Sequence, residues 1–255
     1  NTNLGELKKL IDPLLLNIQD IAAVQGSTLA HIAYHNCNKT LSHWGAQSGL
    51  PARCFDDEFP SYERLPRKFE IDIKGIGDGK TIIMQMNGMN LGDRITDNNH
   101  EDDGYRFHDV FHIAGAAMLG WSPVFRGLLK VKRKSVSKID EVEDGARASI
   151  IEEAIINHVY DYARPHFLEN VKRVDSDLIK RIQSLVQGYE VSECEAWEWQ
   201  KYILKSYEIF RAFKENGNGR WVSIGGLSLG KIDPQKLRGN KQVSKNEISK
   251  LLQAN

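Results

Sequence analysis

Cysteine is scarce in this sequence, with Cys37, Cys54 and Cys194 as the only three among 255 residues. Their odd number, wide spacing and lack of a Cys-x-x-Cys motif argue against a disulfide framework or a cysteine-rich zinc site. No apolar run approaches the roughly 20 residues that a membrane-spanning helix requires, and the first residues lack the apolar segment of a signal peptide. We therefore expect a cytoplasmic protein that has no membrane partner.

Neither sign of charge is in excess, because 34 Lys and Arg residues balance 34 Asp and Glu residues. A general nucleic-acid binder needs a basic surface, so this balance argues against that class of protein. Hydrophobic residues make up 41% of the chain. At this length they are sufficient to bury a core in one large or two small domains.

The N-terminal part of the chain is predicted to be helical. Apolar residues recur at helical spacing in residues 4–24, where Pro13 marks a helix start or a kink. A second helix is predicted for residues 27–46, and several prolines indicate a long loop in residues 47–66. We treat residues 1–66 as an N-terminal helical segment followed by this loop.

The rest of the chain is predicted to be mainly α, with a small β element. Residues 67–88 place alternating apolar residues around a glycine-rich turn and predict a β-hairpin, whereas residues 91–99 are predicted to form a loop. A second small hairpin, turned by Gly225 and Gly226, is predicted for residues 220–230. Helical periodicity indicates helices in residues 101–119, about 139–163, 175–188 and 195–215.

The segment HEDDGYRFHDVFH gathers acids, an arginine and histidines at the front of an apolar helix. On a continuous helix, Asp102, Arg106 and Asp109 would share one face. A second acidic pair, Glu152 and Glu153, stands among isoleucines and has the pattern of a buried segment. Buried carboxylates are costly unless a cation neutralises them, and Mg²⁺ prefers oxygen ligands. Two acidic helices that face each other therefore predict a divalent-metal site.

The acidic residues also have a structural alternative. They would cap helix N-termini and pair with Arg147, Arg106 and Lys138. For Glu101 and Asp103, at the start of the predicted helix, this alternative is as open as a metal role.

The histidines of the same segment allow a further interpretation. His108 and His112 have HxxxH spacing, but the HExxH signature of zinc metalloproteases is absent. The dipeptide His108-Asp109 resembles that of the HD phosphohydrolases, in which His and Asp hold a metal pair. The alternative is that these histidines only pack against the core or support neighbouring acids.

A basic run lies between the two acidic segments. It is either a solvated linker or, beside a carboxylate–metal site, a binding site for the phosphates of an anionic substrate. In the turn-rich segment upstream, Asp97 and Asn98 either cap the helix or contact a nucleotide base or ribose. The predicted substrate-binding residues are Lys132, Arg133, Lys134, Asp97, Asn98 and Tyr105.

Long motifs in this sequence resemble a known family. The string GDRITDNNHEDDGYRFHDVFHIAGAAMLGWSPVFRGLLKVKRKS, followed by IDEVEDGARASIIEEAI, closely resembles the C-terminal domain of MazG-like nucleotide pyrophosphohydrolases. The later string AWEWQKYILKSYEIFRAFKENGNGRWVSI is similar to the closing helix and short hairpin of that domain. The resemblance covers about residues 67–230 and leaves residues 231–255 as a polar tail.

The resemblance implies an all-α NTP-pyrophosphatase-like helical bundle with a small β-hairpin element. It also implies Mg²⁺-dependent cleavage of a nucleoside triphosphate, ribose or deoxyribose, to the monophosphate and pyrophosphate, with Mn²⁺ as an alternative ion. By position, Glu152 and Glu153 stand for the paired glutamates of the family and Asp109 for its aspartate. The implied metal ligands are Asp109, Glu152, Glu153, Asp102 and Asp103.

Two positions depart from the family pattern, because Arg106 and Ile156 stand where acids are usual. In the implied mechanism, Arg106 and Lys132 stabilise charge on the phosphates, and Glu153 orients or deprotonates the attacking water. The departures keep open a nucleotide-sensing or scaffold subunit that has lost the chemistry.

The resemblance further implies a homo-oligomer, since folds of this kind often bury their helices between subunits. It is also compatible with one component of a multi-protein system, such as an antiviral defence cassette, that works with a partner protein.

Overall fold

The computed structural model describes residues 4–44, 53–164, 166–217, 219–224 and 228–229. The chain divides into two compact units, residues 1–48 and residues 49–255, which are treated separately below. Within the described ranges, no helix is both long enough and apolar enough to cross a bilayer.

The first unit is a pair of helices, α1 (Leu4–Val24) and α2 (Leu29–Trp44). Pro13 lies inside α1 without ending it, and Gly26 adopts a φ of +68° in the turn between the helices. Ala22 is the one buried residue among the described side chains of the pair. Large apolar side chains on α1 are instead exposed: Leu7, Leu10, Ile11, Leu14, Leu15, Leu16, Ile18, Ile21 and Val24.

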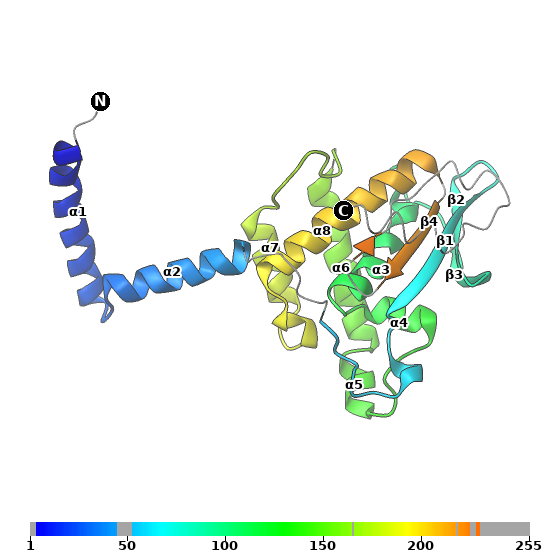
Figure 1. The fold of residues 1–255 in the computed structure, drawn as a ribbon. Coiled ribbons are helices and arrows are strands. Elements are labelled where there is room, and N and C mark those ends of the chain that lie inside the picture. The colour runs from blue at the N-terminus through cyan, green and yellow to red at the C-terminus, as the bar shows by residue number, and fades with distance from the viewer. Residues whose placement is uncertain (1–3, 45–52, 165, 218, 225–227, 230–255) are drawn as a thin grey trace. The chain divides into compact units, whose positions relative to one another are not determined.

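The second unit is mainly helical, as predicted. Its α-helices are α3 (Asp109–Met118), α4 (Pro123–Leu129), α5 (Ser137–Val142), α6 (Ala146–Ala163), α7 (Ser176–Leu185) and α8 (Ala196–Asn216). Helix α3 packs along α8 and against α4, while α6 packs against α4 and α7 (Figure 1). Buried aromatic side chains fill the α3–α8 contact, including Phe111, Tyr207 and Phe210. This packing fixes the position of α3, which carries the site described below.

The β element is one antiparallel sheet rather than two separate hairpins (Figure 1). Its described strands are β1 (Lys68–Ile76), β2 (Thr81–Met86), β3 (Met89–Ile95), β4 (Gly219–Ile224) and β5 (Ser228–Leu229), in the order β3-β2-β1-β4-β5. Strand β1 pairs with β4, so the two predicted hairpins become neighbours. The apolar alternation of β1 is confirmed, because Phe69, Ile71 and Ile73 all face the core. The predicted glycine turn at Gly225-Gly226 lies outside the described residues.

Strand β3 corrects the prediction of a loop over residues 91–99. It pairs with β2 despite Gly92, whose φ is +66°, and despite an irregular register between Ile82 and Met84. Its polar composition reflects its position at the edge of the sheet, where most of its side chains are exposed.

The helix predicted over residues 101–119 starts later than the sequence pattern indicated. A 3-10 turn, η2 (Tyr105–Phe107), precedes α3, and Gly104 has a φ of +86°. The Asp97 carboxylate accepts hydrogen bonds from the backbone N–H groups of Gly104 and Arg106. These contacts hold the backbone out of the α-helix, because side-chain acceptors compete with helical hydrogen bonds. The predicted shared helical face of Asp102, Arg106 and Asp109 is therefore wrong.

The helix predicted over residues 139–163 is divided into α5 and α6. Gly145, with φ −83° and ψ 175°, is extended at the start of α6 and interrupts the helix. Its position beside the carbonyl oxygen of Glu141 leaves no room for a Cβ atom, which would lie 2.0 Å from that oxygen.

A buried ion-pair network joins the segment before β1 to the helices. Asp56 is 1% exposed and accepts hydrogen bonds from the Leu65 backbone N–H at 2.7 Å and from Arg126 Nη2 at 2.7 Å. Arg67 binds the other oxygen of the same carboxylate. Asp56 therefore binds a fully buried arginine and a backbone N–H at once.

Candidate active site

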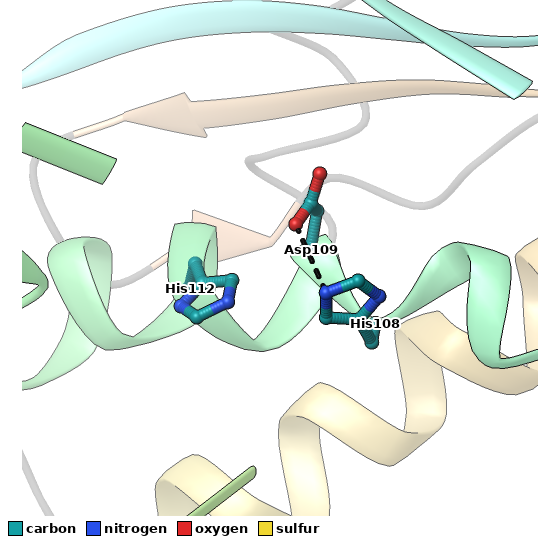
Figure 2. Close-up of side chains that lie close together, drawn as sticks. All are labelled: His108, Asp109 and His112. Atoms are coloured by element: carbon teal, nitrogen blue, oxygen red, sulfur yellow. Dashed lines mark ion pairs between the residues drawn. The ribbon is translucent and has the colours of Figure 1, made fainter. Parts of the chain in front are cut away.

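The candidate site lies at the N-terminal end of α3. His108 immediately precedes the helix, Asp109 is its first residue, and His112 follows one turn later. One donor atom from each of the three side chains can be chosen so that all lie within 4.8 Å of one another. Figure 2 shows the three side chains together, with His108 Nε2 lying 3.5 Å from Asp109 Oδ1.

The ring of His108 is fixed on both its edge and its face. Its Nδ1 lies 2.9 Å from the backbone oxygen of Tyr105, and its ring stacks on the Tyr105 ring at 4.3 Å between centroids with 10° between planes. A carbonyl oxygen only accepts hydrogen bonds, so Nδ1 must carry the proton in this contact. The other nitrogen, Nε2, is therefore left with a lone pair in the neutral ring.

His112 is fully buried between two carboxylates from α6. Glu152 Oε1 lies 2.9 Å from its Nδ1, and Glu153 Oε1 lies 3.2 Å from its Nε2. Burial alone would lower the pKa of His112, but the charges of Glu152, Glu153 and Asp109 raise this pKa well above its ordinary value. For Glu153 the effects are reversed. Burial raises the pKa of Glu153, but the contact with His112 outweighs the effect of burial and lowers this pKa below its usual range.

Helix α6 presents its two adjacent glutamates differently. Glu152 stands on the buried face of α6, and its Oε2 accepts a hydrogen bond at 3.0 Å from the backbone N–H of Val124 in α4. The Glu153 side chain is 45% exposed. One glutamate is thus fixed inside the helical core, whereas the other reaches both His112 and solvent.

Some of the sequence-predicted metal ligands lie together and others do not. Asp109, which is 8% exposed, raises the pKa of the same imidazole that Glu152 and Glu153 contact. Asp102 instead binds Arg106 Nη1 at 2.6 Å, and Asp103 binds Arg164 at 3.1 Å. The structure therefore gathers three of the five predicted acids around His112.

The loop before η2 has a largely structural role. Arg106 Nη1 binds Asp97 at 2.8 Å in addition to Asp102, so the guanidinium is held within the loop. Asn98, the other residue predicted there to bind substrate, has a positive φ of 50°. This loop borders an open hollow of about 500 Å³, which is lined by Lys80, Thr96, Asp97, Asn98, Asn99, His100, Glu101 and Asp102.

The basic run after α4 is divided between the interior and the surface. Arg133 is buried, and its Nη2 lies 2.7 Å from both Asp144 Oδ1 and Glu190 Oε1. Its guanidinium therefore stabilises the fold and is not free to hold a phosphate. Lys134 is exposed and Lys132 is partly buried near Gly127, and no described contact joins either lysine to the cluster on α3.

The sequence predicts only an alternative metal role for the two histidines and a substrate role for Tyr105. The structure places His108 and His112 at the centre of the site and Tyr105 against the His108 ring. The HxxxH spacing was the available signal for the histidines. No sequence signal indicated the stacked Tyr105, because its position depends on the non-helical turn before α3.

The donor set is compatible with a divalent metal ion. Both ring nitrogens of His112 are buried and have no partner in hydrogen-bonding geometry, despite the nearby glutamate oxygens. Ligands of one ion with bonds of about 2.0–2.2 Å lie at most about 4.4 Å apart. The donors of His108, Asp109 and His112 lie within 4.8 Å of one another, so small side-chain rotations would bring them into range.

A comparison with protein-family models identifies the family of this domain. The model of the MazG C-terminal domain matches residues 51–225, which include all the residues of the site. The chain belongs to the MazG C-terminal domain family. This membership relates the chain to the nucleotide pyrophosphohydrolases and places the clustered acids of α3 and α6 within the MazG C-terminal domain. Comparisons with curated proteins and with solved structures gave no match.

Proposed function

We propose that this member of the MazG C-terminal domain family is a divalent-metal-dependent nucleotide pyrophosphohydrolase. It would convert a nucleoside triphosphate, ribose or deoxyribose, to the monophosphate and pyrophosphate. The observation that carries the proposal is that Asp109 from α3 and Glu152 and Glu153 from α6 surround one buried imidazole, His112. Carboxylates from two helices in a partly dry site are suited to a cation that binds phosphate oxygens.

The residues at the site have distinct roles in this proposal. Asp109 and Glu153, with the two histidines, would hold the ion, which supplies a Lewis acid for the phosphates and for the attacking water. Glu153 is partly exposed and lies beside His112, so its carboxylate is placed to accept the proton of the water. Water attacks the α-phosphorus, and the bond from that phosphorus to the bridging oxygen of the leaving pyrophosphate breaks. The proton of the water moves to Glu153. Glu152 holds His112 from the opposite side.

The proposal extends to the substrate contacts and to the setting in which the protein works. Lys132 and Lys134 are proposed to contact phosphates, and Asp97 and Asn98 line a hollow of suitable size for part of a nucleotide. Mg²⁺ is the ion expected from the family resemblance. We also propose a cytoplasmic location and a role beside a partner protein in a defence system.

We expect the purified chain to release pyrophosphate from at least one nucleoside triphosphate when Mg²⁺ or Mn²⁺ is present. The Glu153→Gln variant should lower turnover by about 10²–10⁴-fold, because it removes a base and a negative charge from the site. Pyrophosphate and monophosphate are measured across a panel of NTPs and dNTPs. Glu169→Gln, at an exposed position in the loop after α6, is the control and should keep wild-type turnover. Absence of pyrophosphate with every nucleotide and both ions would refute the proposal.

The geometry of His108, Asp109 and His112 favours an HD-like metal phosphohydrolase as the second candidate. Such an enzyme would release orthophosphate from phosphomonoesters, which a pyrophosphohydrolase would leave intact. The same assay therefore separates the two by product. Nucleotide binding in calorimetry without any product would instead indicate the binding or scaffold subunit, in line with Arg106 being held by Asp97 and Asp102.

A further inference from the structure

We infer that the metal centre is a mixed nitrogen–oxygen site that binds a first-row transition ion, such as Mn²⁺ or Co²⁺, in preference to Mg²⁺. The site comprises His108 Nε2, Asp109 and His112 Nε2, with Glu153 at its exposed side. The inference deepens the proposed function by naming the class of ion, and it depends on that function only for its catalytic meaning.

The first supporting observation is the tautomer of His108. Its Nδ1 is occupied by the Tyr105 carbonyl, and its Nε2 lies toward Asp109 at 3.5 Å (Figure 2). Metal-binding histidines commonly donate one ring N–H to a carbonyl, which fixes the ring and leaves the other nitrogen free to bind. The stacked Tyr105 ring adds a second restraint on the same orientation. His108 is therefore arranged as a ligand before any ion arrives.

The second observation is independent of the first and concerns His112. This side chain is 0% exposed, and neither of its ring nitrogens has a partner in hydrogen-bonding geometry. Nε2 lies 3.2 Å from Glu153 Oε1 but outside hydrogen-bonding geometry, so an ion bound there would give this buried nitrogen a well-placed partner. Glu152 lies 2.9 Å from Nδ1 and is itself held by the Val124 N–H. Glu152 thus lies behind His112 at ion-pair distance, on the side where a carboxylate commonly orients a metal-binding histidine, and we assign it a positioning role.

The type of ion follows from the donor atoms. Mg²⁺ prefers an octahedron of oxygen ligands and rarely takes imidazole, whereas imidazole favours Zn²⁺, Fe²⁺ and other transition ions. For a site of two imidazoles and carboxylates, affinity should rise from Mn²⁺ to Co²⁺. The two histidines therefore shift the selectivity away from the all-carboxylate site that the paired glutamates alone would predict.

The inference is tested by metal binding to the full chain, without nucleotide. Calorimetry should show that Mn²⁺ and Co²⁺ bind at least about tenfold more tightly than Mg²⁺, and bound Co²⁺ should give visible absorption bands that change when imidazole is lost. His112→Gln and His108→Gln should each weaken Co²⁺ binding by at least about tenfold. His166→Gln, at an exposed histidine outside the cluster, should leave both readouts unchanged. The His108 side chain is 13% exposed, so its variant serves as the second test if the buried His112→Gln fails to fold.

The outcomes separate this inference from the proposed function. Equal affinity for Mg²⁺ and Co²⁺, or Co²⁺ binding that survives the histidine variants, would overturn the inference even if pyrophosphate is released. Selective Co²⁺ binding that depends on both histidines, without pyrophosphate release, would support the inference and refute the proposed function.

A second and separate observation concerns the apolar stripe of α1. Leu7, Ile11, Leu14, Ile18 and Ile21 follow one another at intervals of four, three, four and three residues, and each is at least 38% exposed. This is the a/d spacing of a coiled coil, with Ile11 and Ile18 at a positions and Leu7, Leu14 and Ile21 at d positions. The turn to α2 buries Ala22 and leaves this stripe uncovered within the helix pair.

We propose that the stripe is covered by α1 of a second copy of this chain. A heptad stripe is self-complementary, because identical side chains interleave at the same register in a parallel pair. Isoleucine at both a positions with leucine at two of the three d positions favours two strands. Most helix stability in proteins comes from the packing of an apolar face, so α1 gains stability from such a partner.

The expected result is a dimer or larger assembly of the full chain in analytical ultracentrifugation. The double variant Ile11→Ser/Ile18→Ser should shift the protein to the monomer, whereas Leu16→Ser, which is 61% exposed but off the stripe, should not. Circular dichroism and the melting of the second unit confirm that each variant is folded. A monomeric wild-type protein, or an assembly that survives the double variant, would contradict the proposal.

Discussion

Replacing Asp56 with asparagine should lower the free energy of unfolding by about 3–5 kcal/mol, the cost of leaving a buried charge without its partner. Asp56 and Arg126 are each 1% exposed and lie 2.7 Å apart. Burial and the charge of Arg133 lower the pKa of Arg126, and the Asp56 carboxylate is among the groups that oppose this shift. Asparagine keeps the size of the side chain but removes that charge. The measurement is equilibrium unfolding in urea, with the midpoint falling at an unchanged slope.

The adjacent residue provides a matched control. Asp57 also binds Arg67, but its side chain is 66% exposed, and exposed ion pairs contribute about 0–1 kcal/mol. Asp57→Asn should therefore change the unfolding free energy by less than about 1 kcal/mol. Equal effects of the two variants would show that the buried network does not support the fold.

The difference in unfolding free energy between wild type and Asp56→Asn should depend on pH. Burial raises the pKa of Asp56, but the Leu65 N–H, Arg67 and Arg126 outweigh it and lower the pKa below the ordinary value of 3.8. A carboxyl whose pKa is lower in the folded state contributes stability above its unfolded pKa and loses it as the pH falls. The difference in unfolding free energy between wild type and Asp56→Asn should therefore be largest above about pH 5 and decrease below about pH 4.

Asp109→Asn should lower nucleotide turnover by about 10²–10⁴-fold, because the variant removes the carboxylate that α3 contributes to the proposed metal centre. The fold should be retained, since asparagine fits the same space and Asp109 is not a member of the buried arginine network. The variant should also need more metal ion to reach half-maximal rate. Turnover is measured as pyrophosphate release over a range of metal concentrations.

Asp177→Asn is the control for this experiment. The Asp177 side chain is 71% exposed on α7 and binds Lys180, so the same chemical change there should keep turnover within a factor of about two, as expected for a surface substitution. Wild-type turnover in Asp109→Asn would refute the assignment of this carboxylate. Asp102→Asn offers a further comparison, because sequence reasoning gave it a metal role and the structure pairs it with Arg106.

Local patterns predicted much of the fold. The helical stripe of α8, the alternation of β1 and the mainly α class all follow from spacing along a short stretch of chain. Strand β3 was missed because edge strands are polar and its hydrogen bonds come from β2. The pairing of β1 with β4 joins segments about 150 residues apart, as Ile71 lies opposite Trp221, and periodicity within either segment does not encode it.

The site was also predicted only in part, because local patterns do not show which distant residues it contacts. The pattern of acids on two apolar helices predicts metal roles for Asp109, Glu152 and Glu153, and the structure places all three around His112, while their roles stay predictions. Arg133 was assigned to phosphate because it stands in a basic run, yet its partner Glu190 lies 57 residues away. Such distant partners decide whether a charge is free or satisfied, and local sequence does not contain them.

The Asp97 carboxylate connects the sheet to the helix that carries the histidines. It stands two residues beyond the end of β3 and accepts the N–H groups of Gly104 and Arg106, between which Tyr105 is held against His108. The Asp97 side chain thus links the end of β3 to the turn in which Tyr105 stacks on the His108 ring. Loss of the Asp97 carboxylate should therefore release the turn that holds Tyr105 and disturb the orientation of the His108 ring.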